Sequence, residues 1–170
     1  MTSKTDDGQV PSSLELTAIG RISSPYPYPE NMPIEPRGGG TGHVQVDEEY
    51  RAGLKDLAGF ERIWLLFFCH RSRASQLIVT PFLDTTPRGV FATRAPSRPN
   101  ALGISAVRLL SIDERRGILE CAELDIVDGT PLLDIKPYVP RFDAHPHARA
   151  GWLEHRPAEV VLSDTRFAKP

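Results

Sequence analysis

The chain has 170 residues, a length that predicts one domain or one domain with a tail. Apolar residues make up 40% and charged residues 25%, a composition that is typical of a globular protein and excludes a wholly disordered one. The formal net charge of −2 does not indicate a globally basic nucleic-acid-binding protein. The longest apolar run, Ile63 to Cys69, is far shorter than the roughly 20 residues of a membrane-spanning helix, so no such helix is expected.

The first 13 residues, MTSKTDDGQVPSS, lack the apolar segment of a secretory signal, and we expect them to form a disordered tail. Cys69 and Cys121 lie in apolar stretches, with no second cysteine at metal-ligand spacing. We therefore expect a cytoplasmic protein with two buried, reduced thiols.

The first half of the chain predicts strands separated by a long loop. Alternating apolar residues predict strands over 14–22 and 43–46, with a proline- and glycine-rich loop over 24–42 between them. Tyr50, Leu54 and Leu57 recur at helical spacing between a possible cap, Asp47, and Gly59. This spacing predicts a short amphipathic helix over 47–59.

The rest of the chain is rich in β-forming residues. ERIWLLFFCH, residues 61–70, predicts a buried central strand. Further strands are expected over 76–83, 89–93, 104–112, 117–127 and 132–136, followed by a proline- and histidine-rich segment that Trp152 packs down. Because helices do not alternate with strands, a doubly wound α/β sheet is disfavoured. The sequence predicts a mainly-β, compact barrel with one short helix and long loops.

Positive charge is concentrated in the middle of the chain. From Arg71 to Arg108 there are six arginines, one acid (Asp84) and no lysine. The planar fork of arginine suits phosphate or carboxylate groups, so this stretch is either a site for an anionic partner or an ordinary solvated surface.

Several common catalytic patterns do not fit. GGGTG at 38–42 has no Lys-Ser/Thr after it and no strand–turn–helix context, so it is either a flexible cover over a ligand or a linker. His145 and His147 have no cysteine or carboxylate cluster beside them, and we expect no metal site. The chain has no G-x-S-x-G motif of a serine hydrolase. His70 ends the central strand, where it is either a site residue or a satisfied buried histidine.

Asp134 and Lys136 stand two residues apart on a predicted strand and so share one face. This face is either the solvent side of the strand or the mouth of a barrel pocket that also contains Asp125 and Asp128.

Three segments are long and unusual: LAGFERIWLLFFCH (57–70), GVFATRAPSRPNALGIS (89–105) and LDIVDGTPLLDIKPYVP (124–140). They resemble the TrmO/TsaA-like family of S-adenosylmethionine-dependent tRNA methyltransferases, and IGRISSPY (19–26) is similar to that family's first strand and loop. The resemblance extends over residues 14–142 and leaves 143–170 as a C-terminal extension. It implies a β-barrel that binds the cofactor, a homodimer with the cofactor near the subunit interface, and methyl transfer to N6 of N6-threonylcarbamoyladenosine beside the tRNA anticodon.

The same resemblance implies roles for individual residues. The cofactor-binding positions are Pro36, Arg37, Gly38, His70, Arg71, Arg94, Ile104, Ala122, Glu123, Leu124 and Asp125. Arg98, Asn100 and Tyr138 are the expected tRNA-facing positions. We expect Asp134 to act as a catalytic base or orienting group, and Lys136 to hold the threonyl carboxylate or a phosphate.

Three classes of function remain open on the sequence. The first is the tRNA methyltransferase, and the second is an adenosylmethionine-dependent methyltransferase acting on another RNA or a small molecule. The third is a non-catalytic module that binds adenosylmethionine or RNA. Members of the family can carry an additional C-terminal domain, whereas here we expect only the short extension over 143–170. The loop over 36–42 is unusually rich in glycine.

Overall fold

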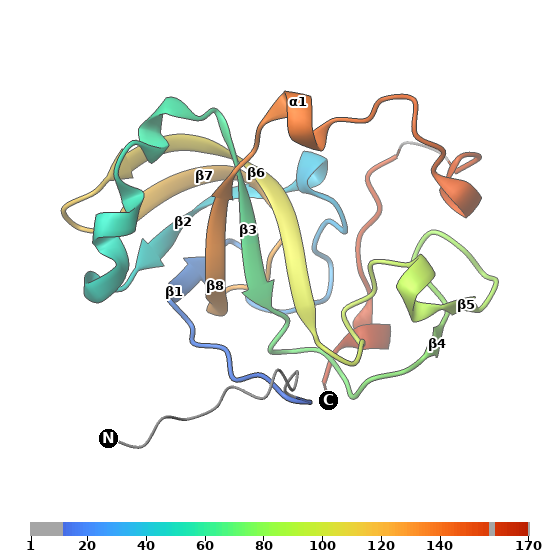
Figure 1. Cartoon of the computed structure of the whole chain (residues 1–170). Helices are drawn as coiled ribbons and strands as arrows, with labels where there is room; N and C mark the ends of the chain where they lie inside the picture. Colours follow the sequence, from blue (N-terminus) through green and yellow to red (C-terminus); the bar gives the residue numbers. More distant parts are fainter. Residues whose placement is uncertain (1–11, 157–158, 170) are drawn as a thin grey trace, which may run out of the picture.

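Six strands close into a barrel in the computed structural model, which describes residues 12–156 and 159–169 (Figure 1). The strand order is β1-β2-β7-β6-β3-β8, and every neighbouring pair is antiparallel. The strands are β1 (Gly20–Ser23), β2 (Gly40–Val46), β3 (Arg62–Phe68), β6 (Leu102–Asp113), β7 (Ile118–Leu124) and β8 (Thr130–Pro137). The predicted mainly-β barrel is confirmed, and most of the predicted disordered tail lies outside the described residues.

Smaller elements surround the barrel. A two-stranded ribbon, β4 (Ile78–Val79) with β5 (Arg88–Gly89), lies to one side of it, as Figure 1 shows. The one α-helix among the described residues is α1 (Pro140–Asp143). The 3-10 helices are η1 (Pro36–Gly38), η2 (Glu48–Leu54), η3 (Leu57–Gly59), η4 (Val90–Ala92), η5 (Gly151–Leu153) and η6 (Thr165–Phe167).

The core fills the inside of the barrel because side chains alternate between the inner and outer faces of each strand. In β3, Ile63, Leu65 and Phe67 point inward and are buried, while the residues between them face outward. Val44 of β2 and Leu119 of β7 are likewise fully buried in the same cluster. The central strand predicted over 61–70 is therefore confirmed, with slightly narrower bounds.

Four local predictions were wrong. The strand expected over 14–22 begins only at Gly20, as β1. The segment 47–59 forms two 3-10 helices rather than one amphipathic helix, because Asp56 has a left-handed backbone (φ 67°) that interrupts it, and Asp47 makes no side-chain cap. The strand expected over 76–83 shrinks to the two residues of β4, because Pro81 has no N–H to continue a ladder. The strand expected over 89–93 is mostly η4.

The glycine-rich segment 38–42 is neither a free cover nor a plain linker, since β2 already begins at Gly40. Gly42 lies so close to β1 that an added Cβ would overlap the carbonyl oxygen of Ser23. Because Gly42 has no side chain, β1 and β2 can approach each other closely at this end of the barrel.

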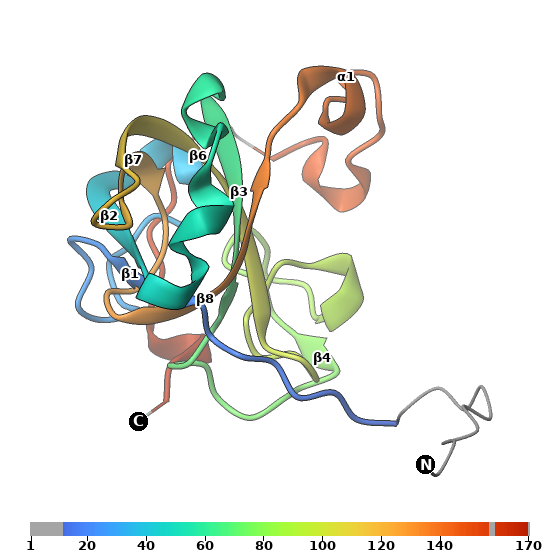
Figure 2. The ribbon, with the colours of Figure 1, turned by 60° about the vertical axis from the view of Figure 1, so that its left-hand side comes forward.

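The C-terminal segment, residues 159–169, runs back along the barrel toward the ribbon (Figures 1 and 2). It forms single bridges to the loop before η1, at Pro33 with Leu162, and to the chain after β3, at Ser72 with Ala168. The guanidinium of Arg166 donates to the carbonyls of Thr80 and Pro81 near the ribbon. The segment thus connects parts of the chain that are far apart in sequence.

Within the described part of the chain, no helix has the length and apolar character needed to cross a membrane.

The turn between β6 and β7 supplies a test of the fold. Gly117 has φ +71°, and a Cβ there would collide with the carbonyl oxygen of Val46 and the side chain of Arg51. We expect Gly117→Ala to lower the free energy of unfolding by at least about 1 kcal/mol, measured by urea unfolding. Gly53→Ala is the matched control, because Gly53 has open space around it and should change stability by no more than about 0.5 kcal/mol. Equal unfolding midpoints for the two variants would contradict this view of the turn.

Candidate functional site

A cavity of about 1050 Å³ lies at the end of the barrel where β3 stops and β6 begins. Its other walls come from the ribbon region and the C-terminal segment, and its size matches pockets that hold small molecules and cofactors. The structure brings seven predicted site residues to its lining: His70, Arg71, Arg94, Arg98, Asn100, Ile104 and Asp125.

Asp125 is one of four acidic residues that line this cavity, with Glu35, Glu159 and Asp164, of which Glu35 and Asp164 pair with Arg37 and Arg166. Asp125 directly follows β7, and its Oδ1 accepts a hydrogen bond of 2.6 Å from the hydroxyl of the buried Ser105 in β6. Burial raises the pKa of Asp125, and the Ser105 hydrogen bond and the charge of Arg94 oppose that rise. The carboxylate is held in a fixed position, where it can accept hydrogen bonds from a ligand.

His70 is a neutral hydrogen-bonding group in the same cavity. Burial, followed by the charges of Arg71, Arg21 and Lys169, lowers its pKa from 6.5, so the imidazole is uncharged at pH 7. The Thr130 hydroxyl donates to a backbone carbonyl at 2.6 Å and therefore accepts from Nδ1 of His70 at 3.3 Å. This arrangement leaves Nε2 of His70 as an acceptor.

Two arginines are oriented by backbone carbonyls. Arg94 donates from Nη2 to the carbonyl oxygen of Ile104 at 2.7 Å, and Arg98 donates from Nη1 to that of Thr93 at 3.1 Å. No ion pair within the described residues involves Arg71, Arg94 or Arg98. Their positive charges therefore remain available to an anionic ligand, as the arginine-rich stretch suggested.

The two thiols differ in position. Cys121 is fully buried in the core, whereas Cys69 is half-buried and lines the cavity. Burial raises the pKa of Cys69 to about 11, so its thiol is protonated at neutral pH and is a poor nucleophile.

Other predicted cofactor positions lie outside the cavity lining. Pro36, Arg37 and Gly38 form η1, and Arg37 pairs with Glu35 at 3.2 Å. Ala122 and Leu124 are buried, and the Glu123 side chain pairs with Arg62 at 2.8 Å and, more loosely, with Arg108 at 3.9 Å. Of the run 122–125, only Asp125 contributes to the lining.

Glu123 shapes the backbone that carries Asp125. It has φ +64°, and the register between β2 and β7 gains one residue there, since Gly40 and Gly42 pair with Leu124 and Cys121. This is a β-bulge with a left-handed residue, a conformation that favours glycine. The ion pairs of Glu123 hold its side chain on the outside of the barrel while the chain turns toward the cavity.

The structure does not bring Asp134 and Lys136 to the cavity. Their side chains form an ion pair of 2.8 Å and are 44% and 61% exposed. They lie on the outward face of β8, because they pair with the outward-facing Leu66 and Trp64 of β3. Asp125 lines the cavity, and the Asp134–Lys136 pair does not.

The remaining residues around this pair also face outward. Asp128 is exposed and accepts a hydrogen bond from the backbone of Ser24. The Tyr138 ring packs 5.5 Å from that of Trp64 and also lies away from the cavity lining.

Sequence reasoning missed the aromatic wall of the cavity. Phe82 and Phe91 come from the ribbon region, Trp152 from η5 and Phe167 from the C-terminal segment. The rings of Phe82 and Phe167 meet edge to face at 5.1 Å. The prediction that Trp152 packs down its segment had a structural basis, because its Nε1 donates to the carbonyl of Ala92 at 2.8 Å.

A group of charges holds this wall in place. The Asp84 side chain is only 3% exposed; it accepts from Nε of Arg88 at 2.9 Å and pairs with Arg156 at 2.6 Å. The Arg88 guanidinium lies 4.8 Å from the ring centroid of Trp152. We call these four residues the Asp84 cluster, which ties residues 152–156 to the ribbon.

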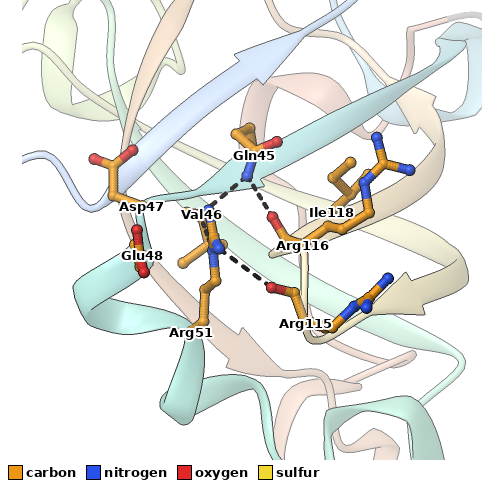
Figure 3. A pocket seen from close by; sticks show the side chains of 8 residues that line it. All are labelled: Gln45, Val46, Asp47, Glu48, Arg51, Arg115, Arg116 and Ile118. Atoms are coloured by element: carbon orange, nitrogen blue, oxygen red, sulfur yellow. Dashed lines mark hydrogen bonds between the residues drawn. The ribbon is translucent and has the colours of Figure 1, made fainter.

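A second hollow of about 380 Å³ lies at the other end of the barrel, beside the β6–β7 turn (Figures 1 and 3). Figure 3 shows Gln45 and Arg51 pointing toward that turn, where they donate to the carbonyls of Arg116 at 2.9 Å and Arg115 at 3.2 Å. The Gln45 bond ties β2 to the turn and the Arg51 bond ties η2 to it, and acidic Asp47 and Glu48 share the hollow. Its polar groups thus have a structural role.

Among the residues that the structure describes, no group of three histidine, cysteine, aspartate or glutamate side chains is arranged to hold a metal ion.

Comparisons with known proteins agree on one family. The model of the tRNA-methyltransferase O N-terminal domain matches residues 21–144. A probable S-adenosyl-L-methionine-binding protein of Pyrococcus abyssi is 49% identical over 155 residues, which cover 88% of this chain and 82% of that protein. The tRNA (adenine(37)-N6)-methyltransferase of Escherichia coli is 34% identical over 165 residues, covering 91% of this chain and 70% of that enzyme.

Solved structures give the same result. The crystal structure of TrmO from Pseudomonas aeruginosa superimposes with a TM-score of 0.68 at 34% identity, over 82% of this chain. The matched part of the present chain spans 62% of that solved chain.

The Asp84 cluster predicts a pH-dependent stability. Hydrogen bonds from Arg88 hold the pKa of Asp84 at about 2, below the ordinary 3.8. Because the pKa is lowered on folding, the carboxylate stabilises the fold above pH 4 and loses this effect as the pH falls toward 2. We expect Asp84→Asn to lower the thermal midpoint at pH 7, with a difference from wild type that shrinks between pH 4 and pH 2.

The matched control is Asp47→Asn, since the exposed Asp47 makes no side-chain cap. Circular dichroism melting curves at pH 7, 5, 3 and 2 measure both variants. A constant difference between Asp84→Asn and wild type across that range would contradict the ionic role of Asp84.

Proposed function

The chain belongs to the tRNA-methyltransferase O N-terminal domain family, and from this premise we propose that it methylates N6 of N6-threonylcarbamoyladenosine next to the tRNA anticodon, using S-adenosylmethionine. The observation that carries the proposal is the cavity. It combines one fixed carboxylate, Asp125, with the unpaired cations Arg71, Arg94 and Arg98 at the end of a matching barrel.

The side chains of the cavity fit adenosylmethionine chemically. The cofactor carries hydroxyl and ammonium donors, a carboxylate and a flat adenine. Asp125 and the neutral His70 offer acceptors to the donors, while Arg94 and Arg71 offer cations to the carboxylate. Apolar groups such as Ile104 and Val127 supply a wall for the adenine.

The chain's own residues bind the cofactor and the acceptor, orient them and exclude water. When bound, adenosylmethionine supplies a methyl group that its positive sulfonium already activates, so no protein nucleophile is needed. The aromatic wall and the C-terminal segment shield the cavity, and positioning can supply much of the acceleration. The acceptor N6 is a poor nucleophile while it holds its proton, because it is conjugated to a purine and a carbamoyl group. We assign Asp134 as the group that takes this proton and Lys136 as the partner of the threonyl carboxylate.

This assignment requires a second subunit, and we propose a homodimer that works in the cytoplasm. The outward faces of β3 and β6 carry three neighbouring apolar side chains that are partly exposed, Phe68 (43%), Leu102 (46%) and Ile104 (45%), and such a patch can bind a partner. Leu102 and Ile104 also line the cavity, so the apolar face reaches its rim.

Asp134 lies on that same face. Ile104 and Asp134 both pair with Leu66, and two strand spacings of roughly 5 Å each separate them. A second copy bound to this face would place the Asp134 of one subunit beside the cavity of the other. Such a dimer explains why Asp134 does not line the cavity of its own subunit.

A cofactor-binding module without catalysis is the alternative, favoured by relatives that are named only as S-adenosyl-L-methionine-binding proteins. A methyltransferase for another RNA or a small molecule is a further one. Methyl transfer from labelled adenosylmethionine to two tRNA pools separates these functions. One pool carries N6-threonylcarbamoyladenosine without the methyl group, and the other lacks the threonylcarbamoyl group.

We expect label in the first pool alone. Label in neither pool, together with measured cofactor binding, would favour the binding module or a different acceptor. Label in both pools would contradict recognition of the threonylcarbamoyl group.

Two substitutions distinguish an effect on cofactor binding from an effect on the rate of methyl transfer. Asp125→Asn keeps an acceptor for Ser105 but removes the charge, and we expect calorimetry to show cofactor binding weakened about 10- to 100-fold. Asp134→Asn should leave cofactor binding unchanged and lower the single-turnover rate about 100-fold or more, as expected for loss of a general base. Full turnover by Asp134→Asn would rule out its role as the base.

A further inference from the structure

We propose that Phe91, backed by Trp152, forms the stacking platform for the acceptor adenine, so that the cavity has a separate aromatic compartment for an unstacked RNA base. This inference rests on the proposed tRNA substrate and adds the subsite that receives it. Neither of the two rings is assigned above to the cofactor or to the acceptor.

Phe91 is an exposed aromatic side chain on a rigid support. It occupies the middle of η4, it is 75% exposed, and it lines the cavity. Its neighbour Val90 is 1% exposed and anchors η4 in a small apolar cluster with Val79 and Phe167. The Phe91 ring is therefore exposed at the cavity mouth, and the buried Val90 side chain holds the backbone that carries it.

Trp152 extends the same surface. Its indole N–H donates to the carbonyl of Ala92, the residue after Phe91, and the ring lines the cavity. The Arg88 guanidinium stacks 4.8 Å from its centroid and is itself held by Asp84. Two aromatic rings, one open and one clamped, thus stand on adjacent parts of one wall.

The charges around these rings suit RNA. Arg94 and Arg98 follow η4 within seven residues of Phe91, line the same cavity and have no acidic partner among the described ion pairs. A cationic rim beside exposed aromatic rings is the pattern by which proteins hold single-stranded nucleic acid, with bases on the rings and phosphates on the arginines. A base must leave its stack to reach a methyl donor inside a cavity, and such a platform would compensate the lost stacking.

The occupant we commit to is therefore the acceptor purine with its flanking phosphates. Unpaired arginines at the rim would oppose a second copy of the same rim, since like charges would face each other. The apolar face of β3 and β6 meets this rim at Leu102 and Ile104, and it serves the proposed dimer.

The test measures binding of a fluorescently labelled anticodon stem–loop RNA that contains N6-threonylcarbamoyladenosine, by anisotropy. We expect Phe91→Ala to weaken binding about 5- to 100-fold, the usual effect of one lost base–aromatic stack, and Phe91→Tyr to retain it. The affinity for adenosylmethionine, measured by calorimetry, should not change. Phe142→Ala is the matched control, because Phe142 is 61% exposed on α1 and lies outside the cavity lining.

A second RNA identifies the stacked group. In a stem–loop with an abasic nucleotide at the acceptor position, wild type should bind as weakly as Phe91→Ala, and the variant should lose nothing further. Equal binding of the intact stem–loop by wild type and Phe91→Ala would overturn the platform, as would a further loss for the variant on the abasic RNA.

Two more outcomes would overturn it in different ways. If wild type methylates tRNA and Phe91→Ala does so with unchanged KM for tRNA, the platform is wrong while the proposed function stands. If wild type neither binds nor methylates the RNA, the proposed function fails and the platform with it. A change in sedimentation of Phe91→Ala without a change in RNA binding would assign Phe91 to a protein interface instead.

Discussion

The extra residue in β7 is the constraint on which the functional end of the barrel depends. Side chains alternate along a strand, so Cys121 and Leu124, three positions apart, would normally face opposite sides. Both are fully buried because the bulge at Glu123 absorbs one residue. Without it, Leu124 would leave the core and Asp125 would leave Ser105. The Arg62–Glu123 ion pair lies at this left-handed turn. This turn places the Asp125 carboxylate in the cavity.

The cavity exists because three distant parts of the chain enclose one end of the barrel. The end of the barrel contributes polar groups such as Asp125, the ribbon region and η5 contribute aromatic rings, and the C-terminal segment adds Phe167. Lys169 illustrates this closure, since its Nζ donates to the carbonyl of His70 at 3.0 Å. The groups that bind a ligand and the groups that exclude water thus come largely from different elements.

Local patterns predicted the barrel better than its site. The apolar, β-forming run around Leu65 correctly predicted β3, and the family resemblance pointed to His70, Arg94 and Asp125, which line one cavity. The 3-10 helices over 47–59 escaped prediction because Leu54 and Leu57 satisfy helical spacing in either form. The aromatic wall escaped because its members are brought together only by tertiary packing, which no spacing in the sequence records.

Crystallisation of the chain with S-adenosylhomocysteine, the product form of the proposed cofactor, tests the central claim most directly. The account predicts ligand density in the large cavity, with polar contacts to Asp125 and at least one of Arg71 and Arg94. Density in the hollow beside Arg51 instead, or no binding at saturating ligand, would contradict the assignment of the cavity as the cofactor site.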